Sequence, residues 1–253
     1  TYPAVFSYDV RMGAKVGNDE VGEGEHGINF NLWGPNTRPG RQIKDMWNSL
    51  TELLNEDGKM FGINDANPEL GETTSRYDLA YAAYGDKRYA DIVQRGDVKK
   101  RNLLYGVPEL PVTPKGQKLP TTKSDNAGVA ILRSQAQTQT PHEQYQVALK
   151  YGTHGGYHGH YDRLNMVYLR RFGKIATSTR TSWWSYFPYM YRFFVQNSIT
   201  HSMVIVDGKM QMPAQSKVLA YKKGEKFQAM AVENVSQWAN PPYGGLCYSW
   251  WKG

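Results

Sequence analysis

A histidine cluster between residues 154 and 165 holds the side chains best suited to chemistry. His154, His158 and His160 lie within seven residues, among glycines and aromatic residues, and Asp162 follows them. Imidazoles are costly to bury and glycines weaken regular structure, so a core segment does not need this composition. His158 and His160 are two residues apart, so in an extended segment both rings point to the same face. Such a pair can supply a metal ligand beside a catalytic or substrate-binding imidazole, or it can belong to a surface loop.

A second group of polar residues lies between positions 23 and 34. There His26, Asn29, Asn31 and Trp33 stand among glycines and apolar residues. This mixture is typical of a loop that lines a cleft, because loops run over the surface and often carry function. His26 is the candidate for acid–base chemistry in this segment, or it is an ordinary hydrogen-bonded loop histidine.

The formal net charge of +7 and the supply of aromatic rings indicate the class of partner. A basic chain favours a polyanion, either nucleic acid or an acidic polysaccharide. The chain has no long run of Lys or Arg and no known nucleic-acid-binding motif, which argues against nucleic acid. Its 18 tyrosines and 7 tryptophans offer rings on which sugars can stack, although most rings of this kind pack in a core.

The composition excludes several other classes. The single cysteine, Cys247, excludes an internal disulfide framework and a multi-cysteine zinc site. No run of about 18 apolar residues is present, so we expect no membrane span. No signal peptide is visible at Thr1–Pro3, although a mature chain would have lost one.

The first part of the chain has helical patterns. Apolar residues spaced by three and four predict a helix over Arg41–Asn55, with Gly58 ending it. Thr73, Thr74 or Ser75 can cap a second helix that runs to Tyr84, and Gly85–Asp86 breaks it. A short third helix is predicted over Arg88–Gln94. We therefore expect residues 1–107 to form an α-helical domain.

The pattern changes at a proline-rich segment, which we predict to be a linker over residues 108–122. Beyond it, short β-like runs separated by turn signals predict an antiparallel β-sandwich over residues 123–253. The expected strands are 128–133, 144–151, 165–170, 203–207, 217–221 and 227–232.

Three segments in this order resemble the heparinase II/III-like polysaccharide lyases, a group that includes heparin and heparan lyases, alginate and oligoalginate lyases and related uronate lyases. They are Ile63–Asp65 with Tyr77–Asp86, then His154–Asn165, then Ile199–Gln211. The resemblance implies an α+β multidomain fold, in which the C-terminal part of an (α/α) toroid precedes an antiparallel β-sandwich. The toroid is expected to be incomplete, and the sandwich can be truncated.

The resemblance also implies a polysaccharide lyase that cleaves an acidic uronate-containing polysaccharide by β-elimination. The substrate would be a glycosaminoglycan such as heparin or heparan sulfate, or an alginate- or ulvan-like chain. A base removes the C5 proton of the uronate, donors neutralise its carboxylate, and an acid protonates the leaving oxygen. Two alternatives stay open: a non-catalytic acidic-glycan-binding protein that retains the fold, and a metal-dependent hydrolase. Such lyases are usually periplasmic or secreted in bacteria.

In this resemblance, His158 matches a catalytic imidazole, and His160 and His201 match ligands of a structural zinc ion. The family's third ligand is an aspartate, and here that place holds Thr177 or Ser178. Asp162 could substitute for it, or pair with Arg163 or a backbone donor.

Tyrosine and histidine carry the protons in this family. Tyr186, Tyr189 and Tyr191 compete for the catalytic tyrosine, with Tyr189 preferred and Tyr191 next, and Arg192 beside them could bind a substrate carboxylate. His26 is the matching catalytic candidate in the helical part. The remaining substrate-binding candidates are His154, Asn29, Asn31 and Trp33.

Overall fold

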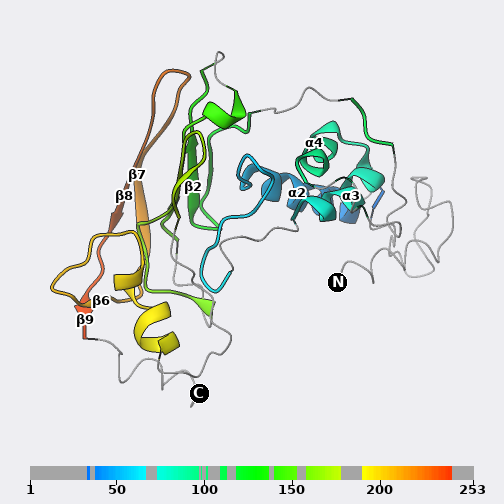
Figure 1. Ribbon diagram of the computed structural model, residues 1–253. Coiled ribbons are helices and arrows are strands. Elements are labelled where there is room, and N and C mark those ends of the chain that lie inside the picture. The colour runs from blue at the N-terminus through cyan, green and yellow to red at the C-terminus, as the bar shows by residue number, and fades with distance from the viewer. Residues whose placement is uncertain are drawn as a thin grey trace, which may run out of the picture. The chain divides into compact units, whose positions relative to one another are not determined.

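A computed structural model describes residues 33–34, 38–66, 73–96, 98, 101, 109–112, 118–136, 140–152, 158–177 and 190–240. The chain forms two compact units (Figure 1). The first consists of residues 1–59 and 71–117, and the second of residues 60–70 and 118–253. Residues 60–70, which the sequence analysis placed with the helices, thus belong to the second unit. The crossing at residues 117 and 118 lies inside the segment predicted as a linker.

The helices of the first unit are α2 (Arg38–Glu52), α3 (Thr73–Tyr84) and α4 (Lys87–Arg95). The three predicted helices are therefore confirmed, with small shifts at their ends. Gly85 ends α3 with a left-handed φ of 63°, and its N–H donates to the Tyr81 carbonyl at 2.8 Å. Asp86 then caps α4 by accepting the Arg88 N–H at 3.0 Å. This cap explains why one predicted break separates two helices.

Aromatic rings form the core of this unit. Tyr77 packs against Trp47 with ring centroids 5.0 Å apart and against Tyr89 at 5.8 Å. The Thr51 hydroxyl is hydrogen-bonded to the Tyr77 hydroxyl at 3.1 Å, so the buried ring keeps a polar partner. Met46, which belongs to the predicted apolar stripe of α2, is 65% exposed, so the stripe is narrower than its spacing suggests.

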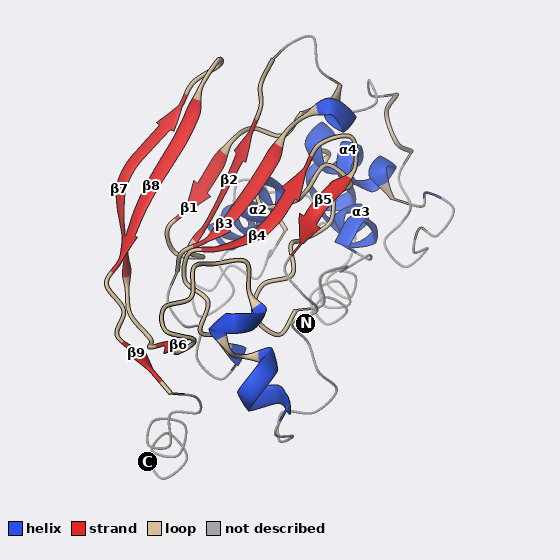
Figure 2. Cartoon of the chain, turned by 60° about the vertical axis from the view of Figure 1, so that its left-hand side comes forward, coloured by secondary structure: helices blue, strands red, loops and turns tan. Residues whose placement is uncertain are grey.

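The second unit contains a five-stranded antiparallel sheet in the order β1-β2-β3-β4-β5 (Figure 2). Its strands are β1 (Thr122–Ser124), β2 (Val129–Arg133), β3 (Gln146–Lys150), β4 (Asn165–Arg170) and β5 (Lys174–Thr177). Burial alternates along β3, as expected for a strand with one face toward a core. Three of these strands were predicted from the sequence, and the short β1 and β5 were not.

Backbones approach closely where β2 begins and β3 ends. Gly128 has a φ of 63°, and a Cβ atom placed on it would lie 1.9 Å from the Gly152 Cα. The Gly128 carbonyl accepts the N–H groups of Tyr151 and Gly152 at 2.7 and 2.9 Å. Only glycine fits this crossing, which fixes the end of β3 and therefore the position of its last residue, Lys150.

A hairpin and a short two-stranded sheet also belong to this unit. Strands β7 (Ser216–Lys223) and β8 (Gln228–Asn234) pair antiparallel, and β6 (Met210–Gln211) pairs with β9 (Trp238–Ala239). The Gln228 side-chain oxygen accepts the Arg133 N–H at 3.0 Å and so ties the hairpin to β2. The arrangement of helices followed by antiparallel sheets confirms the α+β class.

The predicted strand over residues 203–207 is wrong. The Met203 N–H donates to the His201 carbonyl, and the Lys209 N–H donates to the Val206 carbonyl at 3.0 Å. Asp207 adopts a left-handed φ of 54°, and Val204 is 80% exposed. These local turns replace the ladder that the apolar spacing suggested.

No described helix is long and apolar enough to cross a membrane.

The buried ion pair between Asp78 and Arg101 gives a stability prediction for the first unit. Arg101 Nη2 lies 2.6 Å from Asp78 Oδ1, and the Asp78 side chain is 0% exposed. Asp78→Asn should lower the free energy of unfolding by about 3 kcal/mol, because it removes the negative charge from a buried ion pair with the guanidinium. Asp207→Asn is the matched control, since the Asp207–Lys209 pair is exposed, and it should change stability by less than about 1 kcal/mol. Urea unfolding followed by circular dichroism measures both, and equal midpoints would contradict the expectation.

Candidate active site

The carboxylate of Asp65 is the centre of the candidate site. It accepts hydrogen bonds from His158 Nδ1 at 2.8 Å and from His160 Nε2 at 2.9 Å. The Tyr191 hydroxyl lies 2.7 and 2.8 Å from its two oxygens. Because an ionised carboxylate only accepts, the ring nitrogens that face Asp65 carry protons. The structure therefore brings three predicted site residues, His158, His160 and Tyr191, into contact with one carboxylate. No role was predicted for that carboxylate.

The turn that presents Asp65 belongs to the second unit. The Ala66 N–H donates to the Ile63 carbonyl at 3.2 Å, and Asn64 adopts a left-handed φ of 57°. Asparagine tolerates this conformation better than most residues, which explains its place before Asp65. Asn64 and Asp65 were quoted for the family likeness. The sequence signal for Asp65 is that it is a carboxylate in a turn-rich segment. This signal alone does not show that Asp65 contacts a histidine.

The two histidines reach the same carboxylate but differ in exposure. The His158 side chain is 57% exposed, whereas that of His160 is 0% exposed. Residues 158–162 are not in a strand, so the same-face argument for an extended segment does not apply. His158 instead uses Nδ1 and His160 uses Nε2, and this difference lets both rings meet Asp65. Of the two, His158 is the one that an external molecule can reach.

Tyr191 begins the π-helical turn η6 (Tyr191–Val195) and is 3% exposed. This turn is held against the histidine segment by Gln196, whose carbonyl accepts the Tyr161 N–H at 3.0 Å and whose side-chain amide donates to the Gly159 carbonyl at 2.8 Å. π-Helical turns are rare and frequent at functional sites. Arg192 follows Tyr191 on the same turn and is half-buried, and its substrate-binding role stays a prediction.

The surroundings of Asp65 keep its carboxylate ionised. Burial raises its pKa, but the hydrogen bonds from His160, Tyr191 and His158 outweigh that effect, so the pKa lies below its usual value. Asp65 is thus negatively charged at neutral pH. A charged carboxylate that accepts from a histidine fixes the tautomer of that ring.

His160 is also joined to His201, with His160 Nδ1 lying 3.2 Å from His201 Nε2. Behind His201, Asp162 Oδ2 lies 4.0 Å from Nδ1. Burial lowers the pKa of His201 to about 4, against the opposing effect of Asp162, so the ring is neutral at pH 7.

This pair was predicted to bind zinc. Two nitrogens of a tetrahedral zinc site, each about 2.0–2.1 Å from the ion, lie about 3.3 Å apart, which is close to the observed separation. A carboxylate hydrogen-bonded to the other ring nitrogen is the usual outer shell of such ligands, and Asp65 takes this position for His160, whereas Asp162 lies 4.0 Å from His201 Nδ1. Among the described residues, however, no group of three or more His, Cys, Asp or Glu side chains is arranged to hold a metal ion. The described part of the chain therefore supplies two ligand positions and does not complete a zinc site.

Asp162 pairs with a residue that the sequence analysis did not consider. Its Oδ1 contacts the Lys150 ammonium, and its Oδ2 accepts from the Asn165 side-chain amide at 2.9 Å. The expected alternative, a pair with Arg163, is replaced by this contact. Lys150 could have been noticed, because it occupies a buried position of the alternating pattern in β3.

Several other predicted site residues lie outside this cluster. Trp33 is 8% exposed and packs against Tyr84 in the first unit, with ring centroids 5.7 Å apart. Its substrate-binding role stays a prediction. His26, Asn29, Asn31, His154 and the preferred tyrosine, Tyr189, lie outside the described residues.

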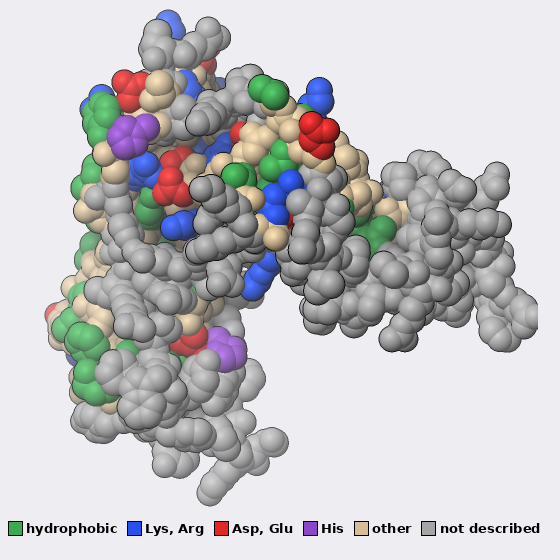
Figure 3. Space-filling model, turned by 45° about the vertical axis from the view of Figure 1, so that its right-hand side comes forward, with side chains coloured by type: hydrophobic (Ala, Val, Ile, Leu, Met, Phe, Trp, Pro, Cys, Tyr) green, Lys and Arg blue, Asp and Glu red, His purple; other side chains and the backbone are tan. Residues whose placement is uncertain are grey.

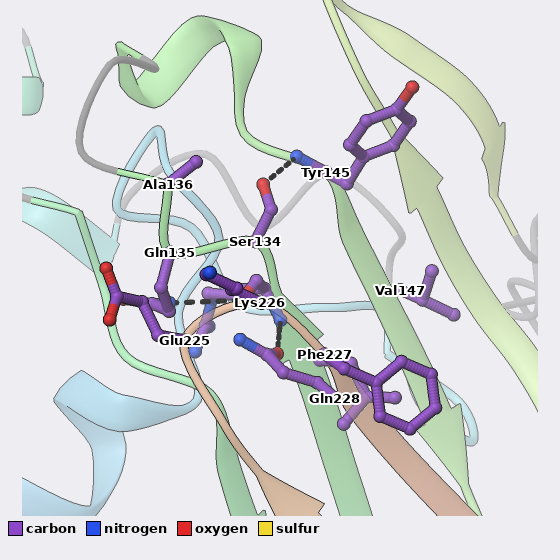
Figure 4. A pocket seen from close by; sticks show the side chains of 11 residues that line it. Ser134, Gln135, Ala136, Tyr145, Val147, Glu225, Lys226, Phe227 and Gln228 are labelled. Carbon is purple, nitrogen blue, oxygen red and sulfur yellow. Dashed lines mark hydrogen bonds between the residues drawn. The ribbon is translucent and has the colours of Figure 1, made fainter.

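A pocket of about 760 Å³ lies elsewhere in the second unit, between the end of β2, the start of β3 and the turn of the β7–β8 hairpin (Figure 4). It is lined in part by Arg133, Tyr145, Lys226 and Phe227, and none of the candidate site residues lines it.

On the face drawn in Figure 3, basic and acidic side chains of the described residues are interspersed. No single patch of positive charge is visible on that part of the surface.

Comparison with known proteins identifies the fold. No protein-family model matches the chain, and no curated protein is similar to it by sequence. Among solved structures, a heparinase III (the BT4657 gene product) is similar with a TM-score of 0.62 and 15% identity, over 83% of this chain and 30% of that chain. The heparan sulfate lyase HepC from Pedobacter heparinus is similar with a TM-score of 0.56 and 13% identity, over 78% of this chain and 29% of that chain.

These similarities concern only part of the solved lyases. The chain spans about 30% of the length of the structures that it matches. At identities of 13–15% the likeness shows a common fold and not a common activity. The described residues of this chain therefore have the fold of part of a heparinase III-type lyase.

Proposed function

We propose that this chain carries part of the active site of a polysaccharide lyase that cleaves an acidic, uronate-containing polysaccharide by β-elimination. The observation that carries the proposal is the convergence of His158, His160 and Tyr191 on the Asp65 carboxylate. The similarity to heparinase III and heparan sulfate lyase structures supports the reaction class. The proposal includes the end of an (α/α) toroid, an antiparallel β-sandwich, and a periplasmic or secreted location.

In the proposed mechanism, His158 is the general base. Its Nδ1 donates to Asp65, so its Nε2 is the unprotonated nitrogen and can accept the C5 proton of the uronate. Asp65 holds the ring in this tautomer and stabilises the imidazolium that forms, as the carboxylate does in other carboxylate–histidine pairs. The exposure of His158 allows this contact with a bound polysaccharide.

Tyr191 is the proposed general acid. Because the Asp65 carboxylate only accepts, the Tyr191 hydroxyl donates its proton toward it. The phenol can then give its proton to the departing glycosidic oxygen, and the product is an unsaturated uronate. Arg192 on the same turn would offset the charge of the substrate carboxylate, which the carbanion intermediate needs.

The reaction class can be tested with a panel of uronate polysaccharides. The full chain, together with any longer natural form, should produce the ultraviolet absorbance of an unsaturated uronate with at least one of heparan sulfate, chondroitin sulfate, hyaluronan, alginate and ulvan. New reducing ends without that absorbance would indicate hydrolysis instead. No change with any member of the panel would overturn the proposal.

The assigned roles predict the effect of two substitutions. His158→Ala and Tyr191→Phe should each lower kcat by about 10²–10⁴-fold, because each removes a proton-transfer group. His158→Ala should leave the melting temperature nearly unchanged, since the ring is largely exposed. His142→Ala is the matched control, because His142 is another exposed histidine of the second unit and should retain activity. Equal activity of His158→Ala and His142→Ala would remove His158 from the mechanism.

A non-catalytic glycan-binding protein is the second candidate. The fold similarity covers only part of known lyases, so the chain can keep a polysaccharide surface without a complete catalytic set. For a binding protein, wild type and His158→Ala would bind heparan oligosaccharides equally well, without turnover by either. Detectable turnover that His158→Ala abolishes would exclude this candidate.

We also propose that His160 Nδ1 and His201 Nε2 hold a structural zinc ion, with further ligands from outside the described residues. The 3.2 Å separation and the two carboxylates behind the rings support this proposal. When bound, zinc would fix the two imidazoles, and no proton transfer passes through it. Metal analysis of purified protein should find about one zinc per chain. His201→Ala should lose the zinc and have a lower melting temperature. His142→Ala is the control and should keep both the zinc and the melting temperature of the wild type. Protein that contains no zinc after folding with zinc present would contradict the proposal.

A further inference from the structure

We propose that Lys150 is a positioning residue of the candidate site, and that its ammonium fixes the turn that carries Asp65 through the side chain of Asn64. The Lys150 ammonium contacts two oxygens, Asn64 Oδ1 and Asp162 Oδ1. It thereby joins two segments that lie far apart in the sequence. The catalytic part of this inference rests on the proposed function, but the positioning part does not.

The burial of Lys150 argues that it has a specific task. Lys150 is 3% exposed and Asp162 is 1% exposed. A buried ion pair gives little net stability compared with apolar residues of similar size, because both charges lose their hydration. An apolar residue could therefore occupy the buried last position of β3. A lysine here is better explained by the geometry that its donors impose.

One end of the contact holds the turn before Asp65. Asn64 has a left-handed φ of 57°, and its side-chain oxygen accepts from Lys150. Asp65 is the next residue, so the orientation of the Asn64 backbone determines where the Asp65 carboxylate lies. Without the ammonium, the Asn64 side chain loses this contact with β3, whereas the hydrogen bond from the Ala66 N–H to the Ile63 carbonyl remains.

The other end is anchored in the sheet. Asp162 Oδ2 accepts from the Asn165 amide, and Asn165 Oδ1 accepts the Ser202 N–H at 3.0 Å. The Lys150 carbonyl accepts the Leu164 N–H at 2.8 Å, next to the start of β4. The ammonium thus connects the turn at residues 63–66 to strands β3 and β4, whose positions are fixed in the sheet. It stands between Asp162, which faces His201, and the turn of Asp65, which faces His158 and His160.

The alternative is that Lys150 only neutralises Asp162, and two variants separate these roles. Lys150→Met combined with Asp162→Asn removes both charges, so it should recover much of the stability that Lys150→Met alone loses, while the tether to Asn64 stays absent. Asn64→Gly is compatible with the left-handed conformation and removes the side chain whose oxygen binds Lys150. Asp207→Gly is the matched control, because Asp207 is an exposed non-glycine residue with a φ of 54° in the same unit.

The double variant and Asn64→Gly should both lower kcat by about 10–100-fold, because a misplaced carboxylate no longer orients His158 and Tyr191. The KM should stay within about twofold, since no substrate contact is removed. Asp207→Gly should retain the kcat of the wild type. Recovery of both the melting temperature and kcat in the double variant would overturn the inference, and so would an unchanged kcat in Asn64→Gly.

A spectroscopic measurement tests the positioning without enzyme activity. In the wild type, the ring N–H of the buried His160 should give a slowly exchanging proton signal in ¹⁵N-edited spectra, which Asp65→Asn identifies by shifting it. Asn64→Gly and the double variant should shift or broaden the same signal, and Asp207→Gly should not. If the signal responds as expected in a protein without turnover, the positioning role stands and the proposed function fails. An unchanged signal in both variants would overturn the positioning role whatever the activity.

Discussion

The partly buried carboxylate of Asp65 holds the candidate site of the second unit together. Asp65 accepts from two imidazoles and a phenol, and each of these donors comes from a segment without regular α or β structure. The π-helical turn of Tyr191 has a backbone hydrogen bond of its own, from the Gln196 N–H to the Tyr191 carbonyl, and the shared acceptor joins the three side chains in one geometry. The carboxylate must stay ionised to accept all three hydrogen bonds. Burial raises its pKa, and the hydrogen bonds from the three donors lower the pKa by more. The site and its centre therefore depend on each other.

The elements around this centre were predictable to different degrees. Helices α2, α3 and α4 and strands β2, β3, β4, β7 and β8 follow from local spacing and from turn residues, because periodicity reports directly on which face is buried. The strand expected over residues 203–207 failed, because its apolar residues have no partner strand and the Asp207–Gly208 turn begins there. The short β1, β5, β6 and β9 were not predicted, because two to four residues are too few to show a period.

The candidate site was predictable in its donors but not in its acceptor. His158, His160, His201 and Tyr191 could be chosen from residue types and from the resemblance, since they lie within about fifty residues of one another in the sequence. Asp65 lies 93 residues before His158 and 126 before Tyr191, and no local pattern links positions so far apart. The same holds for Lys150, whose partner Asn64 is 86 residues away. Contacts of this kind appear only when the chain is folded.

The chain passes from the first unit to the second, back to the first, and into the second again, at residues 59–60, 70–71 and 117–118. The second unit is therefore not contiguous in the sequence. A gene fragment that starts after residue 117 would encode all of β1 to β9 and yet omit the carboxylate that its histidines require. Recombination that transfers this site must therefore carry residues 60–66 together with the sheet, and with them residues 71–117 of the first unit, which lie between the two in the sequence.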